Sequence, residues 1–128
     1  MTTLTLRLLD ETFSIHSLAV DSKIPSEVFE ASVYFIGKTF EEISIVLPSS
    51  ITLNSEDCEP DWQALEVVGP LDFILTGILS SISTVLANEK ISIFAISTFD
   101  TDYVLVKNNT LNAAIEALRA NHYQVIQP

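Results

Sequence analysis

Residues 91–106 read ISIFAISTFDTDYVLV, two runs of β-branched and aromatic residues that fold back on each other around Asp100 and Thr101. Residues of these types favour strands, and the short polar residues between the runs favour a turn, so the stretch predicts a β-hairpin. Because successive side chains of a strand alternate between faces, the first run carries apolar residues on both of its faces: Ile91, Ile93, Ala95 and Phe99 on one, Phe94 and Ile96 on the other. Such a hairpin needs helices on one face and a second layer, or a partner protein, on the other.

Two amphipathic helices are predicted on either side of this hairpin. Upstream, Thr76 is a candidate N-cap for a helix over residues 77–88, where apolar residues recur at helical spacing. Downstream, a second helix begins at Asn109 or Thr110 and ends near Asn121. Residues 62–68 and 123–126 are expected to form strands before the first helix and after the second. The resulting order, β-α-β-β-α-β, is that of a ferredoxin-like unit with both helices on one side of an antiparallel sheet.

The run from residue 76 to residue 106, TGILSSISTVLANEKISIFAISTFDTDYVLV, resembles the second ACT domain of the small tandem-ACT proteins related to the CASTOR arginine sensors. The similarity is a long, ungapped pattern formed by Ile91, Ser92, Phe94, Ser97, Thr98, Phe99, Thr101, Asp102, Tyr103, Leu105 and Val106. A similar layout covers the rest of the chain more weakly. The resemblance implies an ACT fold and an amino acid bound between two ACT units.

The N-terminal half is expected to form a smaller unit. Residues 4–9 and 13–20 read as the two strands of an N-terminal hairpin, and EVFEAS, residues 27–32, reads as at most two turns of helix after Pro25 and Ser26. Residues 33–36 and 43–47 read as a second hairpin. The acidic stretch at residues 54–61, NSEDCEPD, reads as an exposed linker.

The second hairpin repeats part of the stretch at residues 91–106. Thr39, Phe40 and Glu41 align with Thr98, Phe99 and Asp100 at a spacing of 59 residues, and a one-residue deletion then aligns the strands that follow. Either an internal repeat or a chance similarity of two amphipathic hairpins explains this pattern. With the repeat, the sequence predicts an α+β protein of two tandem ferredoxin-like (ACT, βαββαβ) units with antiparallel sheets: an atypical N-terminal ACT-like unit at residues 1–60 and a C-terminal CASTOR-like ACT domain at residues 61–128.

The charge of the chain argues against several partners. Among 128 residues, 6 Lys and Arg face 17 Asp and Glu, for a formal net charge of −11, which repels nucleic-acid phosphates and anionic lipid. No apolar run approaches the ~20 residues that span a bilayer, and residues 1–12 lack the pattern of a signal peptide. We therefore expect a cytoplasmic protein with no nucleic-acid or membrane partner. The single cysteine, Cys58, has acidic neighbours and is interpreted as an inert loop residue.

The sequence also lacks the usual signs of an enzyme. His16 and His122 have no metal-ligand spacing, and the 3 glycines form neither a phosphate loop nor a nucleophile elbow. His16 is interpreted as a surface or half-buried strand residue, and Asp100 and Asp102 as turn acids, with a catalytic carboxylate pair as the alternative. We therefore expect no catalysis, no metal and no cofactor.

A site for a small zwitterion is the functional hypothesis that the residues support. In the turn over residues 69–77, GPLDFILTG, the free N–H groups of a helix start could hold a carboxylate, and Asp102 could hold an ammonium or guanidinium group. The resemblance implies a ligand-binding set drawn from both ends of this region: Thr76, Gly77, Ile78, Ser92, Ile93, Thr98, Phe99 and Asp102.

The expected function is therefore that of a non-catalytic amino-acid-binding regulatory or sensor protein, with arginine as one candidate ligand. Because the resembling sensors contain four ACT units and this chain at most two, a homodimer is expected to complete the site. Two alternatives stay open: a dimerisation or protein-interaction module without a ligand, and a small enzyme of unrecognised mechanism.

Overall fold

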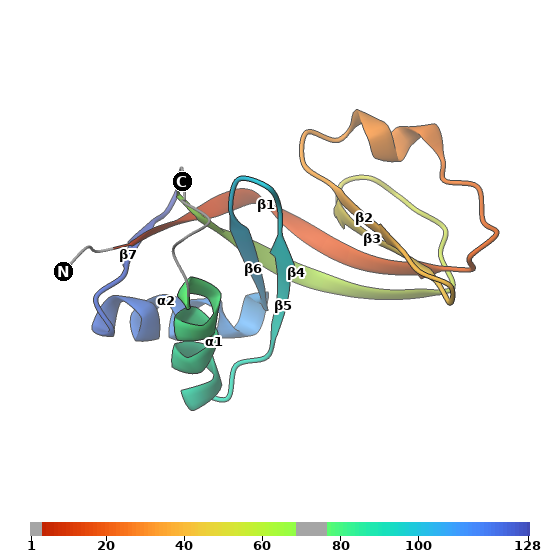
Figure 1. The fold of residues 1–128 in the computed structure, drawn as a ribbon. Coiled ribbons are helices and arrows are strands. Elements are labelled where there is room, and N and C mark those ends of the chain that lie inside the picture. Colours follow the sequence, from red (N-terminus) through yellow and green to blue (C-terminus); the bar gives the residue numbers. More distant parts are fainter. Residues whose placement is uncertain (1–3, 69–76) are drawn as a thin grey trace. The chain divides into compact units, whose positions relative to one another are not determined.

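A computed structural model describes residues 4–68 and 77–128 (Figure 1). The chain forms two compact units, which we call the helical unit (Met1–Asp10 and Gln63–Pro128) and the small unit (Glu11–Trp62). The helical unit is therefore built from two separate parts of the sequence. This differs from the predicted division at residues 60 and 61, because the first residues of the chain belong with the C-terminal part.

The helical unit contains the elements predicted around residues 91–106. Strand β4 (Asp57–Val67) precedes helix α1 (Ile78–Asn88), and strands β5 (Ile93–Ser97) and β6 (Asp102–Lys107) form the antiparallel hairpin. A short 3₁₀ turn, η2 (Asn108–Thr110), leads into helix α2 (Leu111–Ala120), and strand β7 (Gln124–Ile126) follows. The predicted β-α-β-β-α-β order of residues 62–126 is confirmed.

The first strand of the chain, β1 (Thr5–Leu18), runs through both units. Its beginning pairs in parallel with β7, with Leu6 opposite Val125, and β4 lies on its other side. In the helical unit the strand order is therefore β7-β1-β4-β6-β5. The prediction of an N-terminal hairpin from residues 4–9 and 13–20 was wrong, because the chain stays extended through residues 10–12 instead of turning there.

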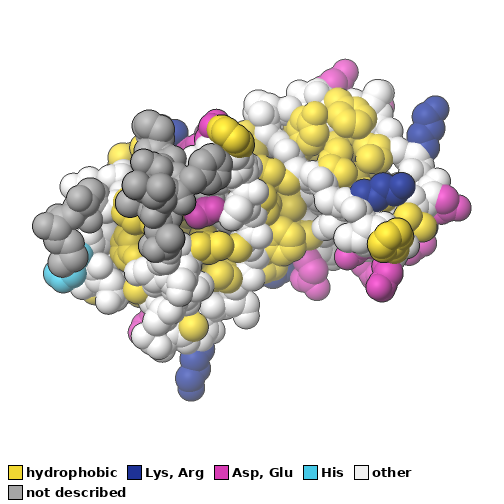
Figure 2. Space-filling view, viewed as in Figure 1, with side chains coloured by type: hydrophobic (Ala, Val, Ile, Leu, Met, Phe, Trp, Pro, Cys, Tyr) yellow, Lys and Arg dark blue, Asp and Glu magenta, His cyan; other side chains and the backbone are white. Residues whose placement is uncertain are grey.

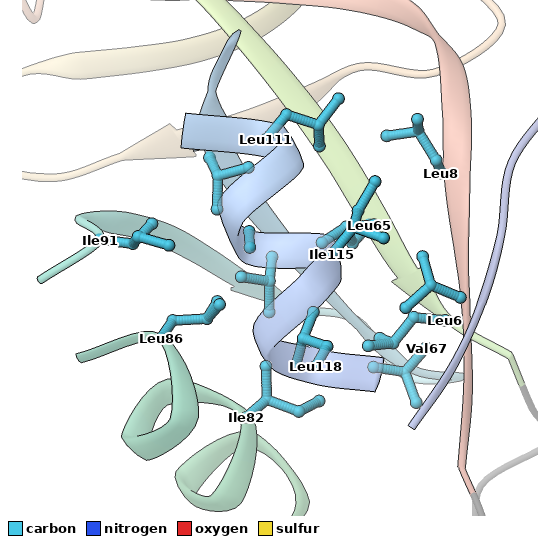
Figure 3. Close-up of a cluster of buried hydrophobic side chains, with 14 residues drawn as sticks. Leu6, Leu8, Leu65, Val67, Ile82, Leu86, Ile91, Leu111, Ile115 and Leu118 are labelled. Atoms are coloured by element: carbon cyan, nitrogen blue, oxygen red, sulfur yellow. The ribbon is translucent and has the colours of Figure 1, made fainter. Parts of the chain in front are cut away.

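The core of the helical unit lies between its sheet and its two helices (Figure 3). Leu111, Ile115 and Leu118 of α2 point toward the strands. Burying one such side chain fully contributes roughly 1.5–3 kcal/mol, so this face holds the unit together. The buried members of the cluster come from every strand and helix of the unit except β5: Leu6, Leu8, Leu65, Val67, Ile82, Leu86, Ile91, Val104, Val106, Leu111, Ala114, Ile115, Leu118 and Val125.

The small unit contains the end of β1, a short 3₁₀ helix η1 (Ser26–Glu30), strand β2 (Phe35–Lys38), strand β3 (Ile43–Pro48) and the start of β4. Strand β3 pairs antiparallel with both β1 and β2, which confirms the second predicted hairpin. The predicted linker is only partly a loop, because its second half, with Cys58, already belongs to β4. Figure 2 shows apolar side chains on the surface of this unit beside lysine and acidic side chains.

The two hairpins share one register, each considered within its own unit. Lys38 pairs with Ile43 in the first hairpin and Ser97 pairs with Asp102 in the second, and the remaining pairs follow at the same offset. Each turn is also closed in the same way, by Thr39 N donating to Glu42 O at 2.9 Å and by Thr98 N donating to Thr101 O at 2.8 Å. The predicted one-residue deletion was wrong, because a constant offset of 59 residues relates the two hairpins.

Candidate functional site

Asp102 is the first residue of β6 and faces Ser97 across the hairpin. Ser97 Oγ donates a hydrogen bond to Asp102 Oδ1 at 2.5 Å. Directly opposed residues share a face, and the alternation of faces places this pair on the same side as the buried Val104 and Val106, the side that the helices cover. Asp102 is half-buried, so its carboxylate lies at the margin of the core, within reach of solvent.

The turn between β5 and β6 is fixed by two threonines. Thr98 Oγ1 donates to Thr101 O and accepts from Thr101 N, at 3.0 and 3.2 Å. Thr101 Oγ1 in turn donates to Val67 O at the end of β4, at 2.5 Å. The turn that carries Thr98 and Asp102 is thus tied to the strand from which the chain leaves toward α1. Phe99, at its tip, is 82% exposed.

Helix α1 begins toward the end of the helical unit that carries this turn (Figure 1). Gly77 precedes the helix in a left-handed conformation, with φ of 79°, and having no side chain it cannot cap the helix through one. The far end of α1 is joined to the start of β5, where Ile91 N donates to Leu86 O. Eleven helical residues and five strand residues each span about 16 Å, so the first turn of α1 lies at the same end as the hairpin turn (Figure 1).

The predicted ligand-binding residues therefore separate into two groups. Gly77, Ile78, Thr98, Phe99 and Asp102 lie at the hairpin-turn end of the helical unit. The other group, Ser92 and Ile93, lies at the opposite end of β5. Thr76 and residues 69–75 of the predicted turn lie outside the described residues.

The distance between the groups is decisive for a small ligand. Ser92 and Ser97 are five positions apart along an extended chain, which is about 16 Å. One free amino acid does not span this distance while also contacting Asp102. A single chain therefore does not bring all the predicted residues around one ligand.

A polar cluster that sequence reasoning missed lies on the other face of the same sheet. Arg7 of β1 donates to Glu66 Oε1 of β4 through Nη2, at 2.7 Å, and Tyr103 of β6 donates to Glu66 Oε2 at 3.1 Å. Burial, followed by the hydrogen bond and the charge of Glu66, raises the pKa of the Tyr103 phenol. Arg7 and Glu66 are 59 residues apart in the sequence, so no local pattern could have paired them.

His16 is more buried than expected. It is 5% exposed, rather than at the surface or half-buried, and its Nδ1 lies 2.9 Å from Ser55 Oγ. Ser55 Oγ donates its own proton to Asp57 O, so His16 Nδ1–H is the donor to Ser55. Burial lowers the pKa of the His16 imidazole, which favours its neutral form.

Neither a metal cluster nor a membrane-crossing helix occurs in the described part of the chain. In residues 4–68 and 77–128, no three His, Cys, Asp or Glu side chains gather in a way that could hold a metal ion. Within the same ranges, no helix has the length and apolar character needed to cross a bilayer.

Comparison with known proteins identifies the class to which this fold belongs. A family model described as ACT domain matches residues 57–120, which is half of the chain. The chain therefore belongs to the ACT domain family.

Individual relatives extend this likeness. The chain is 32% identical over 122 residues to the human protein named cytosolic arginine sensor for mTORC1 subunit 1, covering 88% of this chain but only 37% of that protein. Protein Atu0741 from Agobacterium tumefaciens has a similar structure, with a TM-score of 0.91, 28% identity and coverage of 100% of this chain and 96% of that one. The ligand-free regulatory subunit of aspartate kinase from Thermus thermophilus shares the fold, with a TM-score of 0.64, 12% identity and coverage of 90% of this chain and 95% of that one.

Proposed function

We propose that this protein is a cytoplasmic, non-catalytic regulatory protein that senses a free amino acid, held at an interface between two ACT units of a homodimer. Membership of the ACT domain family and the 32% identity to a protein named as an arginine sensor support an amino acid as the ligand class. Arginine is one candidate.

The chemistry of the hairpin-turn end suits a zwitterion. The first N–H groups of α1 have no partner within the helix, and the positive end of the helix dipole favours a carboxylate there. The Asp102 carboxylate could accept hydrogen bonds from an ammonium or guanidinium group. Charge-assisted hydrogen bonds of roughly 1.5–3 kcal/mol at both ends of a ligand approach the ~8 kcal/mol of micromolar binding.

The separation of Ser92 and Ile93 from Asp102 is the observation that carries the interface proposal. Strand β5 ends the strand path of the helical unit, so its outer edge is the place where another strand could add. If two copies pair antiparallel along β5 with Ala95 at the two-fold axis, Ile93 lies opposite Ser97 of the partner subunit. Each of the two sites then receives its Ser92 and Ile93 from one copy and its Asp102 from the other.

The composition of β5 favours such pairing. Proteins commonly protect free sheet edges with charges or proline, and IFAIS contains neither. Phe94 and Ile96 lie half-buried on the face of β5 away from the helices. Pairing would cover more of both side chains.

The shared register of the two hairpins supports the proposal that the chain is a tandem of ACT-like repeats. The same offset relates every residue pair of β2–β3 to a pair of β5–β6, and it relates the hydrogen bonds of both threonine turns. In this proposal the first repeat is the atypical one, because the 3₁₀ helix η1 stands where the second repeat has α1.

Isothermal titration of the full chain with each of the twenty amino acids tests the ligand class. We expect saturable heat from one amino acid or a few chemically related ones. Silence across the set, in a sample shown to be ligand-free and folded, would contradict the sensor proposal.

Disulfide trapping tests the interface separately. In a Cys58→Ser background, Ala95→Cys should form a covalent dimer in mild oxidant, since residues facing each other across the two-fold axis come within disulfide reach. Ala113→Cys, exposed on α2, is the matched control and should remain monomeric. Equal cross-linking of both variants would contradict pairing along β5.

A dimerisation or protein-interaction module without a ligand is the second candidate function. The uncharged edge strand favours it, as does the exposure of Phe40, which is 101% exposed at the tip of the β2–β3 hairpin. Specific cross-linking at Ala95→Cys combined with silent titrations would select this function over the sensor.

A further inference from the structure

We propose a second binding site, in the small unit, for a small aliphatic primary amine. A hollow of about 220 Å³ opens there between the end of β1 and the stretch that leads into β4. Its lining residues are Leu18, Ala19, Ser22, Asn54, Ser55 and Glu56. This hollow lies within one unit and contains none of the residues proposed to bind the amino acid.

The walls of the hollow are held by backbone hydrogen bonds. Glu56 N donates to Ser17 O at 3.1 Å, which fixes one wall against β1, and Ser22 N donates to Ala19 O at 2.9 Å, which closes the turn of the other. Leu18 is buried in the core of the unit and supplies an apolar floor. The hollow is therefore part of the folded unit and does not depend on a loose segment.

The polar part of the lining combines one acidic side chain, Glu56, with hydroxyl and amide groups that can both accept and donate hydrogen bonds. Within the described residues, the side chains of Ser22, Asn54 and Glu56 make no hydrogen bond to the protein. The Ser55 hydroxyl is already oriented, because it donates to Asp57 O and accepts from His16. Ser55 can offer a ligand only its remaining lone pair.

The Glu56 carboxylate, which is the charged group of this lining, favours a cation that donates hydrogen bonds. A primary ammonium group carries three donors and one positive charge, which match the Glu56 carboxylate and the neighbouring Ser55 and Asn54 oxygens. The net charge of −11 also attracts cations and repels anionic ligands. An alkyl group of a few carbons would cover the floor at Leu18 and Ala19.

Nuclear magnetic resonance titration of the full chain with 1-aminobutane tests this site. We expect saturable shifts of the amide signals of residues 18–22 and 54–56, and no such shifts with 1-butanol or butyrate at equal concentration. Shifts that do not saturate, or that 1-butanol reproduces, would overturn the proposal.

Two variants with one control assign the site. Ser22→Leu fills the hollow and should abolish the shifts, while Glu56→Gln should weaken binding about fivefold, the upper range for an exposed ion pair. Glu30→Gln removes an equal charge from the same unit, outside the lining, and should bind as the parent does. Parent-like binding by a folded Ser22→Leu variant would refute the assignment, whatever the amino-acid titrations give.

Discussion

The hairpins β2–β3 and β5–β6 have the same register and the same threonine turn, yet they differ at the position that we propose binds a ligand. Where the second hairpin has Asp102 at the start of its return strand, the first has Ile43 at the same offset. Ile43 is 2% exposed and belongs to the core of the small unit, whereas Asp102 reaches solvent. The same position of the same hairpin backbone therefore holds a core side chain in one unit and a candidate ligand-binding carboxylate in the other.

The helices near the two hairpins also differ, and this difference again favours a ligand site in the helical unit. Helix α1 has 11 residues and begins toward the end of the helical unit that carries Asp102, whereas the small unit has only the 5-residue η1. A single 3₁₀ turn has little dipole and few free N–H groups to offer an anion. Among the described residues, the helical unit therefore offers the carboxylate and the helix start that the proposed zwitterion site needs, and the small unit does not.

Placing each residue type at the other position, in the variants Ile43→Asp and Asp102→Ile, should produce the largest difference in the free energy of unfolding. Ile43→Asp places a carboxylate in a core position without a partner and should destabilise the protein by roughly 3–5 kcal/mol. Asp102→Ile should leave the free energy of unfolding within about 1 kcal/mol of the parent, because its site borders solvent. Urea unfolding of both variants measures the difference, and equal losses would remove the contrast between the hairpins.

The two described glycines allow a smaller test at the start of α1. Gly77→Ala forces an alanine into the left-handed region and should cost about 1–2 kcal/mol. Gly37→Ala is the control, because Gly37 in β2 has no left-handed φ and an added Cβ meets no atom within 4 Å. Urea unfolding that showed the same loss for both variants would contradict this account of the helix start.

The free energy of unfolding should depend on pH through His16, which is buried in the small unit. Since burial lowers its pKa in the folded state from the ordinary 6.5, the unfolded chain binds this proton first as the pH falls. The stabilisation that comes from keeping His16 neutral is therefore complete above pH 6.5. It is lost as the pH falls from 6.5 through the lowered pKa of the folded state. Denaturant midpoints of the parent and His16→Gln at pH 7.5 and 5.5 check this, and the parent should lose more stability than the variant.

Local pattern was sufficient to predict much of the fold. Alternation in residues 91–106 and the helical spacing of Leu79, Ile82 and Leu86 predicted β5, β6 and α1, since these elements are contiguous in sequence. The pairing of Thr5 with Gln124 joins residues 119 apart and has no local signal, so the placement of β1 in the helical unit was missed. Residues 10–12 misled for a related reason, because turn-forming residue types also occur inside a continuous strand, here one whose two ends pair with different strands, β7 and β3.

The candidate site was predictable to the extent that it depends on the hairpin. Asp102 could be selected because it lies at the start of the return strand of the hairpin, whereas Thr98 was implied by the resemblance to the tandem-ACT proteins. The separation of Ser92 from Asp102 could not be weighed before the bounds of β5 were known, and neither could the burial of His16, which depends on Ser55 39 residues away. Contacts between distant segments decide both.

The central claim is that Asp102 supplies the carboxylate that binds the cationic group of an amino acid. The direct test is the calorimetric affinity of Asp102→Asn and Asp100→Asn for the amino acid that gives the largest heat with the parent. Each variant removes one charge from the same turn, but Asp100 is exposed and has no place in the site. We predict a loss of about tenfold or more for Asp102→Asn and less than about twofold for Asp100→Asn. Equal affinities for both variants would contradict the account.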